Sequence, residues 1–285
     1  MRILLTGATG FIGKKLLQNF CELNYKVAIH IRKPLEGINP DVVVFSGELI
    51  HHKEEIIAYA PQYVFHLAGS SIYPINFKGE ETLWNSNVLY GNTLLNIIRE
   101  ISGLIFVNFT TSLTYNGTLI SPYSYYALTK ANFIQSLEYH VRFNSMRVFN
   151  LILYTVYGKE DHTKRAINYI VESLNAKTPI SMSPGEQQLD FIHVDDVIGL
   201  CIQLLEKKPV TYIENIHVGT GIGTTLKQAA SLIELYRNQK ANIQFGAIPY
   251  RDEEKMMNIA PVANNRFWQS TIPFEKGIVY LFNLQ

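Results

Sequence analysis

The segment TGATGFIG, residues 6–13, lies directly after an apolar run at residues 3–5 and before a helix-like stretch at residues 14–23. A strand, a glycine turn and the first turn of a helix, in that order, bind a dinucleotide pyrophosphate on backbone N–H groups. The glycines are spaced G-x-x-G-x-x-G, at Gly7, Gly10 and Gly13. The first permits a tight turn, the second lets the backbone approach phosphates, and the third lets the helix pack against the sheet. The position of this glycine pattern directly after a strand favours a nucleotide site over an ordinary turn.

Short β-rich runs alternate with helical patterns through the first half of the chain. The expected strands are residues 2–5, 26–31, 42–45, 63–67, 104–109 and 146–153, and the expected helices are residues 14–23, 53–59, 81–101 and 123–143. This alternation predicts an α/β fold with a parallel, doubly wound Rossmann sheet. Ligands of such sheets bind outside the carboxyl ends of the strands.

The second half of the chain is less regular. Helices are expected at about residues 163–174, 197–206 and 226–238, and a strand at residues 213–218. Residues 179–190 and 247–261 carry proline, glycine and charge, which is typical of binding loops. We expect a dinucleotide-binding Rossmann domain over residues 1–158, to which residues 191–218 return. A smaller, interleaved substrate-binding region is expected to comprise residues 159–190 and 219–285.

Composition argues against several classes of partner. The 285 residues carry a formal net charge of +1, and the sequence pI is about 7.8. Without a basic tract, the chain is not expected to bind nucleic acid or a membrane surface. Its two cysteines, Cys21 and Cys201, fit no metal or redox spacing, so we expect buried thiols, a reducing compartment and no metal site. Because we find no signal peptide and no membrane-length apolar run, we expect a cytoplasmic protein.

The end of the second expected strand bears on which dinucleotide the chain binds. Sites for NAD usually place Asp or Glu there to bond the ribose hydroxyls, whereas this strand ends at Ile31 and continues with Arg32 and Lys33. A guanidinium can pair with a 2′-phosphate through two hydrogen bonds, so NADP(H) is favoured over NAD(H). An ordinary solvated loop is the alternative. The fourth strand ends in His66-Leu67-Ala68-Gly69; its small residues let the chain run beside the cofactor, and His66 itself is expected to be a core histidine bonded to backbone.

One Tyr-x-x-x-Lys pair, Tyr126 and Lys130, lies in the helix expected at residues 123–143. Residues four apart share a helix face. An ammonium beside a phenol favours the phenolate, which makes Tyr126 a general acid or base near neutral pH. A surface Tyr and Lys would show the same spacing. The context is Thr110-Thr111-Ser112 after the fifth strand, where a hydroxyl could bond a substrate carbonyl, although Ser/Thr turns are common at strand ends.

Together these motifs resemble the extended short-chain dehydrogenase/reductases, the NAD-dependent epimerase/dehydratase family, over essentially the whole chain. Two further segments fit its sugar-nucleotide branch. Residues 187–196, QQLDFIHVDD, are similar to the branch's RDF(I/V)HVDD segment, and residues 215–221, NIHVGTG, are similar to its NxGxG turn. Leu189 is a departure, because the branch commonly has Arg there. Asp195 and Asp196 are interpreted as a helix N-cap and not as a metal site.

The resemblance implies roles for individual residues. The implied catalytic residues are Ser112, Tyr126 and Lys130, with Thr111 as the alternative hydroxyl. The implied cofactor contacts are Gly7, Thr9, Gly10, Phe11, Ile12, Gly13, Arg32, Lys33, Leu67, Ala68, Gly69 and Lys130. The implied substrate contacts are Ser70, Thr111, Asp190 and Arg251, the last matching an arginine that often binds the substrate diphosphate.

Three features indicate which enzymes of the sugar-nucleotide branch this chain resembles. The 4,6-dehydratases carry Asp-Glu directly after the catalytic Thr, whereas Thr111 is followed by Ser112 and Leu113. Epimerases retain NAD tightly, whereas Arg32 favours an exchangeable NADPH. The short loop at residues 112–126 and the run at residues 183–191 are similar to those of CDP-paratose and CDP-abequose synthases, which reduce the C4 ketone of a CDP-4-keto-3,6-dideoxyhexose with NADPH.

This similarity implies an NADPH-dependent 4-ketoreductase for a CDP- or dTDP-linked deoxyhexose, in surface-polysaccharide sugar biosynthesis. A nucleotide-sugar 4-epimerase and a non-catalytic NADP-binding regulator are the alternatives. The base, the sugar and the C4 stereochemistry stay open.

A homodimer is the expected assembly. The helices expected at residues 81–101 and 123–143 carry apolar residues on more than one face, which requires a second surface to bury them. In the first helix these residues are Leu83, Val88, Leu94, Leu95, Ile97 and Ile98. In the family the two helices pair across a two-fold axis into a four-helix bundle.

Overall fold

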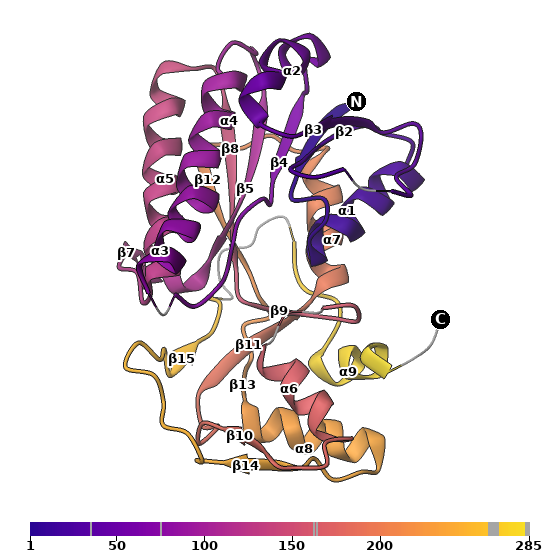
Figure 1. Cartoon of the computed structure of the whole chain (residues 1–285), viewed down its shortest axis with the longest axis vertical. Coiled ribbons are helices and arrows are strands. Elements are labelled where there is room, and N and C mark those ends of the chain that lie inside the picture. Colours follow the sequence, from indigo (N-terminus) through magenta and orange to yellow (C-terminus); the bar gives the residue numbers. More distant parts are fainter. Residues whose placement is uncertain (35, 75, 162, 164, 262–267, 283–285) are drawn as a thin grey trace. The chain divides into compact units, whose positions relative to one another are not determined.

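The computed structural model describes the chain except for residues 35, 75, 162, 164, 262–267 and 283–285 (Figure 1). The chain divides into two compact units. Unit 1 comprises Met1–Ile152 and Leu200–Ile216, and unit 2 comprises Leu153–Gly199 and His217–Gln285. The segment that returns to unit 1 therefore begins at Leu200, whereas the sequence analysis expected residues 191–218 to return.

Unit 1 is built on a seven-stranded sheet in the order β12-β8-β5-β4-β1-β2-β3. The strands are β1 (Arg2–Thr6), β2 (Lys26–Ile31), β3 (Val43–Ser46), β4 (Tyr63–His66), β5 (Ile105–Thr111), β8 (Arg147–Leu153) and β12 (Ile213–Val218). The pairs β1–β2, β1–β4, β2–β3 and β4–β5 are parallel. The strand order reverses between β1 and β4, so the expected parallel, doubly wound Rossmann sheet is confirmed.

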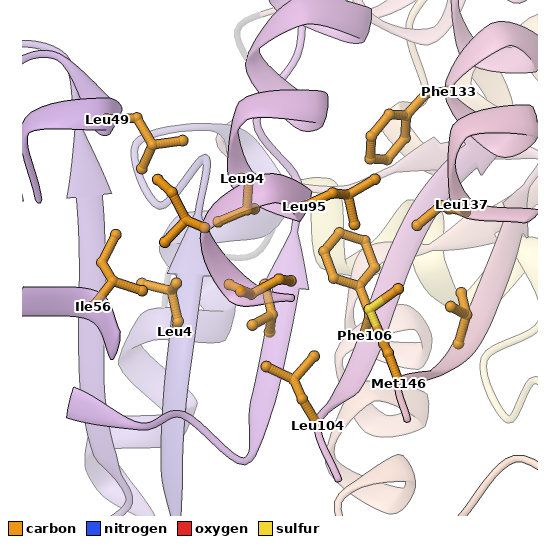
Figure 2. Close-up of a cluster of buried hydrophobic side chains, with 14 of the residues drawn as sticks. Leu4, Leu49, Ile56, Leu94, Leu95, Leu104, Phe106, Phe133, Leu137 and Met146 are labelled. Carbon is orange, nitrogen blue, oxygen red and sulfur yellow. The ribbon is translucent and has the colours of Figure 1, made fainter. Parts of the chain in front are cut away.

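Helices cover both faces of this sheet (Figure 1). The helices are α1 (Phe11–Glu22) on one face, and α2 (Lys53–Tyr59), α4 (Tyr90–Ile98) and α5 (Tyr125–Phe143) on the other. Side chains of a strand alternate between the two faces. In β4, Val64 joins the cluster beneath α2, α4 and α5, whereas the Phe65 ring lies 5.1 Å from that of Phe20 on α1. Figure 2 shows that cluster, in which Leu94 and Phe133 meet the sheet residues.

The helix expected at residues 81–101 forms as three consecutive segments. They are α3 (Phe77–Trp84), a π-helical turn at Asn85–Leu89, and α4. The side chain of Asn76 caps α3 by accepting a hydrogen bond from the Gly79 N–H at 3.0 Å. A π turn carries an extra residue relative to an α turn, so the apolar periodicity shifts at this point.

Unit 2 contains short strands and three helices of its own. The strands are β9 (Thr155–Tyr157), β10 (Ile180–Met182), β11 (Gln188–His193), β13 (Gly223–Thr225), β14 (Ile243–Phe245) and β15 (Met257–Asn258). The helices are α6 (Ala166–Ser173), α8 (Leu226–Arg237) and α9 (Phe274–Phe282), and α7 (Val194–Leu204) spans the boundary of the units. Strand β11 pairs with β9, β13 and β15. The expectation of loops at residues 179–190 and 247–261 is therefore partly wrong, since β10, the start of β11 and β15 lie there.

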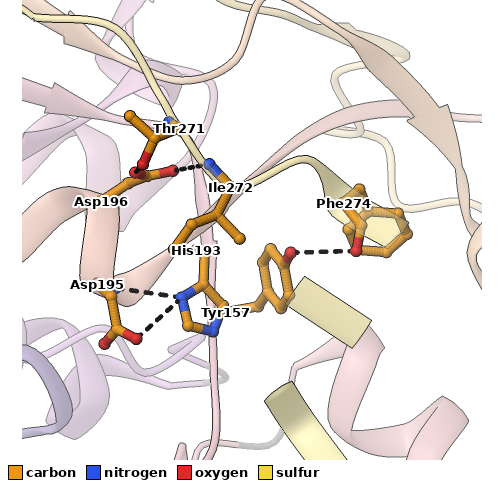
Figure 3. Close-up of polar contacts among 7 residues, drawn as sticks. All are labelled: Tyr157, His193, Asp195, Asp196, Thr271, Ile272 and Phe274. Carbon is orange, nitrogen blue, oxygen red and sulfur yellow. Dashed lines mark hydrogen bonds and ion pairs between the residues drawn. The ribbon is translucent and has the colours of Figure 1, made fainter. Parts of the chain in front are cut away.

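Asp196 holds the segment that leads into α9, which corrects its interpretation as an N-cap. Helix α7 begins at Val194, so Asp195 and Asp196 both lie in its first turn. The buried Asp196 carboxylate accepts hydrogen bonds from the Thr271 N–H at 3.0 Å, the Thr271 hydroxyl at 2.8 Å and the Ile272 N–H at 3.0 Å (Figure 3). These donors come from a distant loop, which a local capping pattern does not reveal.

Three further expectations concern membranes, metals and thiols. In the part of the chain that the structure describes, no helix combines the length and apolar character that a membrane span needs. The same residues hold no group of three or more His, Cys, Asp or Glu arranged for a metal ion. Cys201 is buried as expected, whereas Cys21 is only half-buried, and burial raises the pKa of both thiols.

Candidate active site

The turn between β1 and α1 is held by its own backbone. The Gly10 N–H donates to the Gly7 carbonyl at 3.0 Å. Gly7 has a φ of +75°, in the left-handed region that favours glycine. A Cβ at Gly7 would lie 2.6 Å from the Ala68 nitrogen, and one at Gly13 would lie 2.0 Å from the Gly7 oxygen. At Gly10 a Cβ would meet only the Gly7 oxygen, at 3.4 Å. The fold itself therefore requires glycine at positions 7 and 13, whereas Gly10 leaves space at the surface of the turn.

The start of α1 offers unpaired backbone donors. Gly10 is the N-cap residue, no described side chain caps the helix, and its first turn has no acidic residue. The first N–H groups of a helix have no intrahelical partner, and the helix dipole favours an anion there. Thr9 is exposed, and Phe11 and Ile12 are half-buried at this end of the helix. The donor set fits a dinucleotide pyrophosphate. Arg32 and Lys33, both exposed, directly follow β2, the neighbour of β1.

His66 ends β4 as a core histidine, but its partner is a side chain and not the backbone. Its Nδ1 lies 2.8 Å from the Thr6 hydroxyl, which also accepts a hydrogen bond from the Ala68 N–H at 3.3 Å. Burial, and secondarily the charge of Lys130, lowers the pKa of His66 to about 3. The neutral imidazole thus ties the end of β4 to the end of β1.

Lys130 lies in α5 and is buried. Its Nζ donates to the Phe109 carbonyl at 3.1 Å, and burial lowers its pKa to about 8. A Cβ on Gly69 would lie 3.3 Å from this Nζ. Residues 67–69 therefore touch the Gly7 turn through Leu67 and Ala68 and approach Lys130 through Gly69. The glycine turn and the candidate catalytic lysine converge on one strand end.

Tyr126 lies in the first turn of α5, one turn before Lys130, and is half-buried. The Ser124 hydroxyl caps this helix by accepting from the Ala127 N–H at 3.2 Å. At the end of β5, the Thr111 hydroxyl accepts from the Leu113 N–H at 3.3 Å and so caps the 3₁₀ turn Ser112–Thr114. Ser112 is buried in that turn. The Thr111 hydroxyl therefore stabilises the turn that follows β5.

Asn87, which the sequence analysis did not identify, connects the segments of the site. In the π turn, its amide oxygen accepts from the Ser70 N–H at 2.7 Å, and its nitrogen donates to the Ser70 carbonyl at 2.9 Å. The same nitrogen donates to the Thr129 hydroxyl at 2.9 Å, and that hydroxyl donates to the Tyr126 carbonyl at 2.7 Å. Both backbone groups of Ser70, a candidate substrate contact, are used in this way. Asn87 follows Asn85 and Ser86, so no local sequence pattern distinguished it.

Asp190, a candidate substrate contact, belongs to unit 2, where its carboxylate has a structural role. The side chain is fully buried. Its carboxylate accepts four hydrogen bonds, from the Thr220 N–H and hydroxyl, the Gly221 N–H and the Ala260 N–H, at 2.7 to 3.0 Å. A Cβ on Gly219 would lie 2.5 Å from the carboxylate. Asp190 therefore holds the turn at residues 219–221.

Arg251, the other candidate substrate contact in unit 2, is exposed in the loop before β15. Burial raises the pKa of Glu254, and the charge of Arg251 opposes that rise. Leu189, which stands where an arginine was expected, lies half-buried on β11 beside Asn258 of β15. Unit 2 therefore has an exposed cation at Arg251, although it lacks the arginine expected at position 189.

Relatives of known name align with nearly the whole chain. A CDP-abequose synthase of Salmonella typhimurium is 28% identical over 290 residues, which cover 97% of this chain and 95% of the relative. A CDP-abequose synthase of Yersinia pseudotuberculosis is 25% identical over 268 residues, covering 90% and 91%. The expected similarity to this group is confirmed.

Solved structures share the fold. The UDP-glucose 4-epimerase of Thermotoga maritima, solved with UDP-glucose, has a TM-score of 0.85 at 21% identity, covering 99% of this chain and 97% of that one. MoeE5 in complex with UDP-glucuronic acid and NAD has a TM-score of 0.87 at 20% identity, covering 98% and 97%. The profile of the NAD dependent epimerase/dehydratase family matches residues 3–219, which include all of β1 except Arg2, the glycine turn and α5. The chain belongs to the NAD dependent epimerase/dehydratase family.

Proposed function

We propose that this protein is an NADPH-dependent oxidoreductase that reduces the C4 ketone of a nucleotide-linked deoxyhexose. One observation carries the proposal: residues 67–69 contact the Gly7 turn and approach Lys130. A turn suited to a dinucleotide pyrophosphate and a candidate acid–base helix therefore share one edge of the sheet. Similarity to CDP-abequose synthases along nearly the whole chain supports a CDP-linked 4-keto-3,6-dideoxyhexose or a related substrate.

The cofactor would be held by unit 1. The N–H groups at the start of α1 would bind the pyrophosphate, and Arg32, with Lys33, would bind the 2′-phosphate. Bound NADPH would supply the hydride for the C4 carbonyl carbon. Gly69 has no side chain where a Cβ would lie 2.7 Å from the Asn87 amide oxygen and 3.3 Å from the Lys130 Nζ, so the backbone can pass close to Lys130. Lys130 would bond the nicotinamide ribose.

The proton would come from this chain's own residues. Tyr126 donates its phenolic proton to the C4 oxygen as negative charge develops there. The Lys130 ammonium, with a pKa of about 8, is mostly protonated at pH 7 and favours the resulting phenolate. Ser112 donates a hydrogen bond to the same carbonyl oxygen, and Thr111, whose hydroxyl accepts from the Leu113 N–H, is the alternative donor.

Two of the residues considered for the substrate, Arg251 and Asp190, belong to unit 2. Arg251 would pair with the diphosphate, and Asp190 would position the turn at residues 219–221 without touching substrate. Ser70 and Thr111 stay candidate contacts of unit 1.

The test is a panel of CDP- and dTDP-linked 4-keto deoxyhexoses, followed by NADPH absorbance and product NMR. We expect one NADPH oxidised per product and a single C4 epimer. Interconversion of UDP-glucose and UDP-galactose without added cofactor would instead support the 4-epimerase alternative. Cofactor binding without turnover of any sugar nucleotide would support the regulator.

A homodimer is proposed on the exposed apolar side chains of α3 to α5. Phe77 is 78% exposed, Leu89 51%, Tyr139 61% and Phe143 71%. Monomers rarely leave so many large apolar side chains in water. Light scattering at micromolar concentration should give twice the mass of the 32.5 kDa chain, and Phe143→Glu should shift this toward the monomer. A wild-type monomer would contradict the proposal.

A further inference from the structure

A chain of three polar groups lies beneath the end of β2. The Nε2 of His30 lies 3.1 Å from the Gly47 carbonyl, and the His30 Nδ1 lies 2.8 Å from the Tyr90 hydroxyl. His30 is buried, and Tyr90 is the first residue of α4, directly after the π turn. The Tyr90 ring stacks on His66 with 5.9 Å between centroids and 14° between planes. These two hydrogen bonds thus connect α4, β2 and the end of β3.

The direction of these hydrogen bonds is determined by chemistry. The Gly47 carbonyl can only accept, so the His30 Nε2 carries hydrogen. Burial is the largest cause that lowers the pKa of His30, which keeps the ring neutral and leaves Nδ1 as an acceptor. Tyr90 therefore donates its O–H to His30. Neither ring can turn without losing a buried hydrogen bond.

The charge of Arg32, two residues after His30, acts on the ionisation of both His30 and Tyr90. This charge opposes protonation of His30 and, against the dominant effect of burial, counters the rise in the pKa of Tyr90. The Gly47 N–H also donates to the Ile31 carbonyl at 3.0 Å. Gly47 is thereby bound to His30 and to Ile31, the two residues that directly precede Arg32. The path of the backbone into Arg32 depends on these two bonds.

We propose that Tyr90 is a positioning residue for cofactor choice: through His30 and Gly47 it holds the end of β2 so that Arg32 meets the 2′-phosphate of NADPH. This inference rests on the proposed preference for NADPH. Tyr90 acts through Arg32, so its hydroxyl affects the affinity for the 2′-phosphate. Binding of the part that NADPH and NADH share does not depend on it.

The test compares two fragments that differ only in the 2′-phosphate, 2′,5′-ADP and 5′-AMP, by titration calorimetry. Tyr90→Phe keeps the ring that stacks on His66 and removes the hydroxyl, which donates to His30 and also bonds the Thr6 side chain. We expect it to weaken 2′,5′-ADP binding about fivefold, the scale of one hydrogen bond, and 5′-AMP binding less than twofold. The effect on catalysis should fall on KM for NADPH and not on kcat. His30→Phe, which removes the acceptor of the same bond, should show the same selective loss.

Tyr59→Phe is the matched control, because the Tyr59 hydroxyl donates to the Lys26 carbonyl at 2.7 Å, at the opposite end of β2. It should leave the ratio of the two affinities unchanged. Equal weakening of both fragments in Tyr90→Phe, or no weakening, would overturn the inference while leaving the proposed cofactor intact. A wild-type protein that binds both fragments equally, with Arg32→Ala also without effect, would overturn the NADPH assignment and this inference with it.

Discussion

Lys130 in unit 1 and Asp190 in unit 2 are both buried charged residues, yet they are stabilised in different ways. The Asp190 carboxylate accepts four hydrogen bonds from its own unit. Among the described residues, the Lys130 ammonium donates one hydrogen bond, to the Phe109 carbonyl, and burial lowers its pKa to about 8. Burying a charge is costly unless partners compensate it. A compensated charge stabilises a turn, whereas a poorly compensated one marks a candidate for chemistry.

The largest effect on activity is expected at Lys130, whose charge is poorly compensated, and at its partner Tyr126. Lys130→Met and Tyr126→Phe should each lower kcat by between about 10²- and 10⁴-fold, the range of general acid catalysis. KM should change little for Tyr126→Phe, because the hydroxyl acts mainly in the transition state. Lys130→Met should not lower the melting temperature, since it removes a buried charge. Steady-state kinetics and thermal unfolding measure these effects, and near-normal turnover in either variant would remove the residue from the mechanism.

Asp190→Asn should show the opposite pattern. The amide places donor hydrogens opposite backbone N–H donors, so we expect a loss of about 3 kcal/mol in the free energy of unfolding. Urea unfolding measures that loss. Asp252→Asn, at an exposed position in unit 2, is the control and should be neutral. If Asp190→Asn kept full stability but lost substrate affinity, the residue would contact substrate after all.

A smaller effect is expected from His66, as a function of pH. Its folded pKa of about 3 lies below the unfolded value of about 6.5. Between these values the unfolded chain binds more protons, so stability falls as the pH falls below about 6.5, by about 2 kcal/mol at pH 5. His66→Gln lacks a titrating group and should lose less stability than wild type between pH 7.5 and pH 5. Identical losses in urea unfolding at the two pH values would show that His66 does not titrate in this way.

Much of the architecture of unit 1 could be predicted from the sequence. The strands Lys26–Ile31 and Ile213–Val218 and the helix Lys53–Tyr59 have the expected bounds. In these segments apolar periodicity and turn residues agree with the tertiary fold. The π turn Asn85–Leu89 could not be predicted, because one extra residue changes the helical phase without changing composition. The short strands of unit 2, such as β15 (Met257–Asn258), hold too few residues for an alternating pattern.

The candidate site was only partly predictable. The glycine turn was recognised from local spacing, and the spacing of Tyr126 and Lys130 identified a candidate pair whose roles stay predictions. Asn87 was missed, because its partners Ser70 and Thr129 lie 17 and 42 positions away. Motif matching suggested Asp190 as a substrate contact, but a motif does not record which groups donate to a carboxylate. The four hydrogen bonds that Asp190 accepts were therefore not predicted.

By itself, the sequence determined the alternation of strands and helices, the glycine turn after β1 and the family. These depend on residues within a few positions of one another, and steric limits on the backbone act locally. The tertiary structure alone decided which buried polar groups are compensated. The donors to Asp190 lie 30 to 70 positions away, and the Tyr90 hydroxyl meets His30 across 60 positions. Only packing brings such groups within hydrogen-bond distance, so only the folded chain distinguishes the buried charges that stabilise turns from the candidates for chemistry.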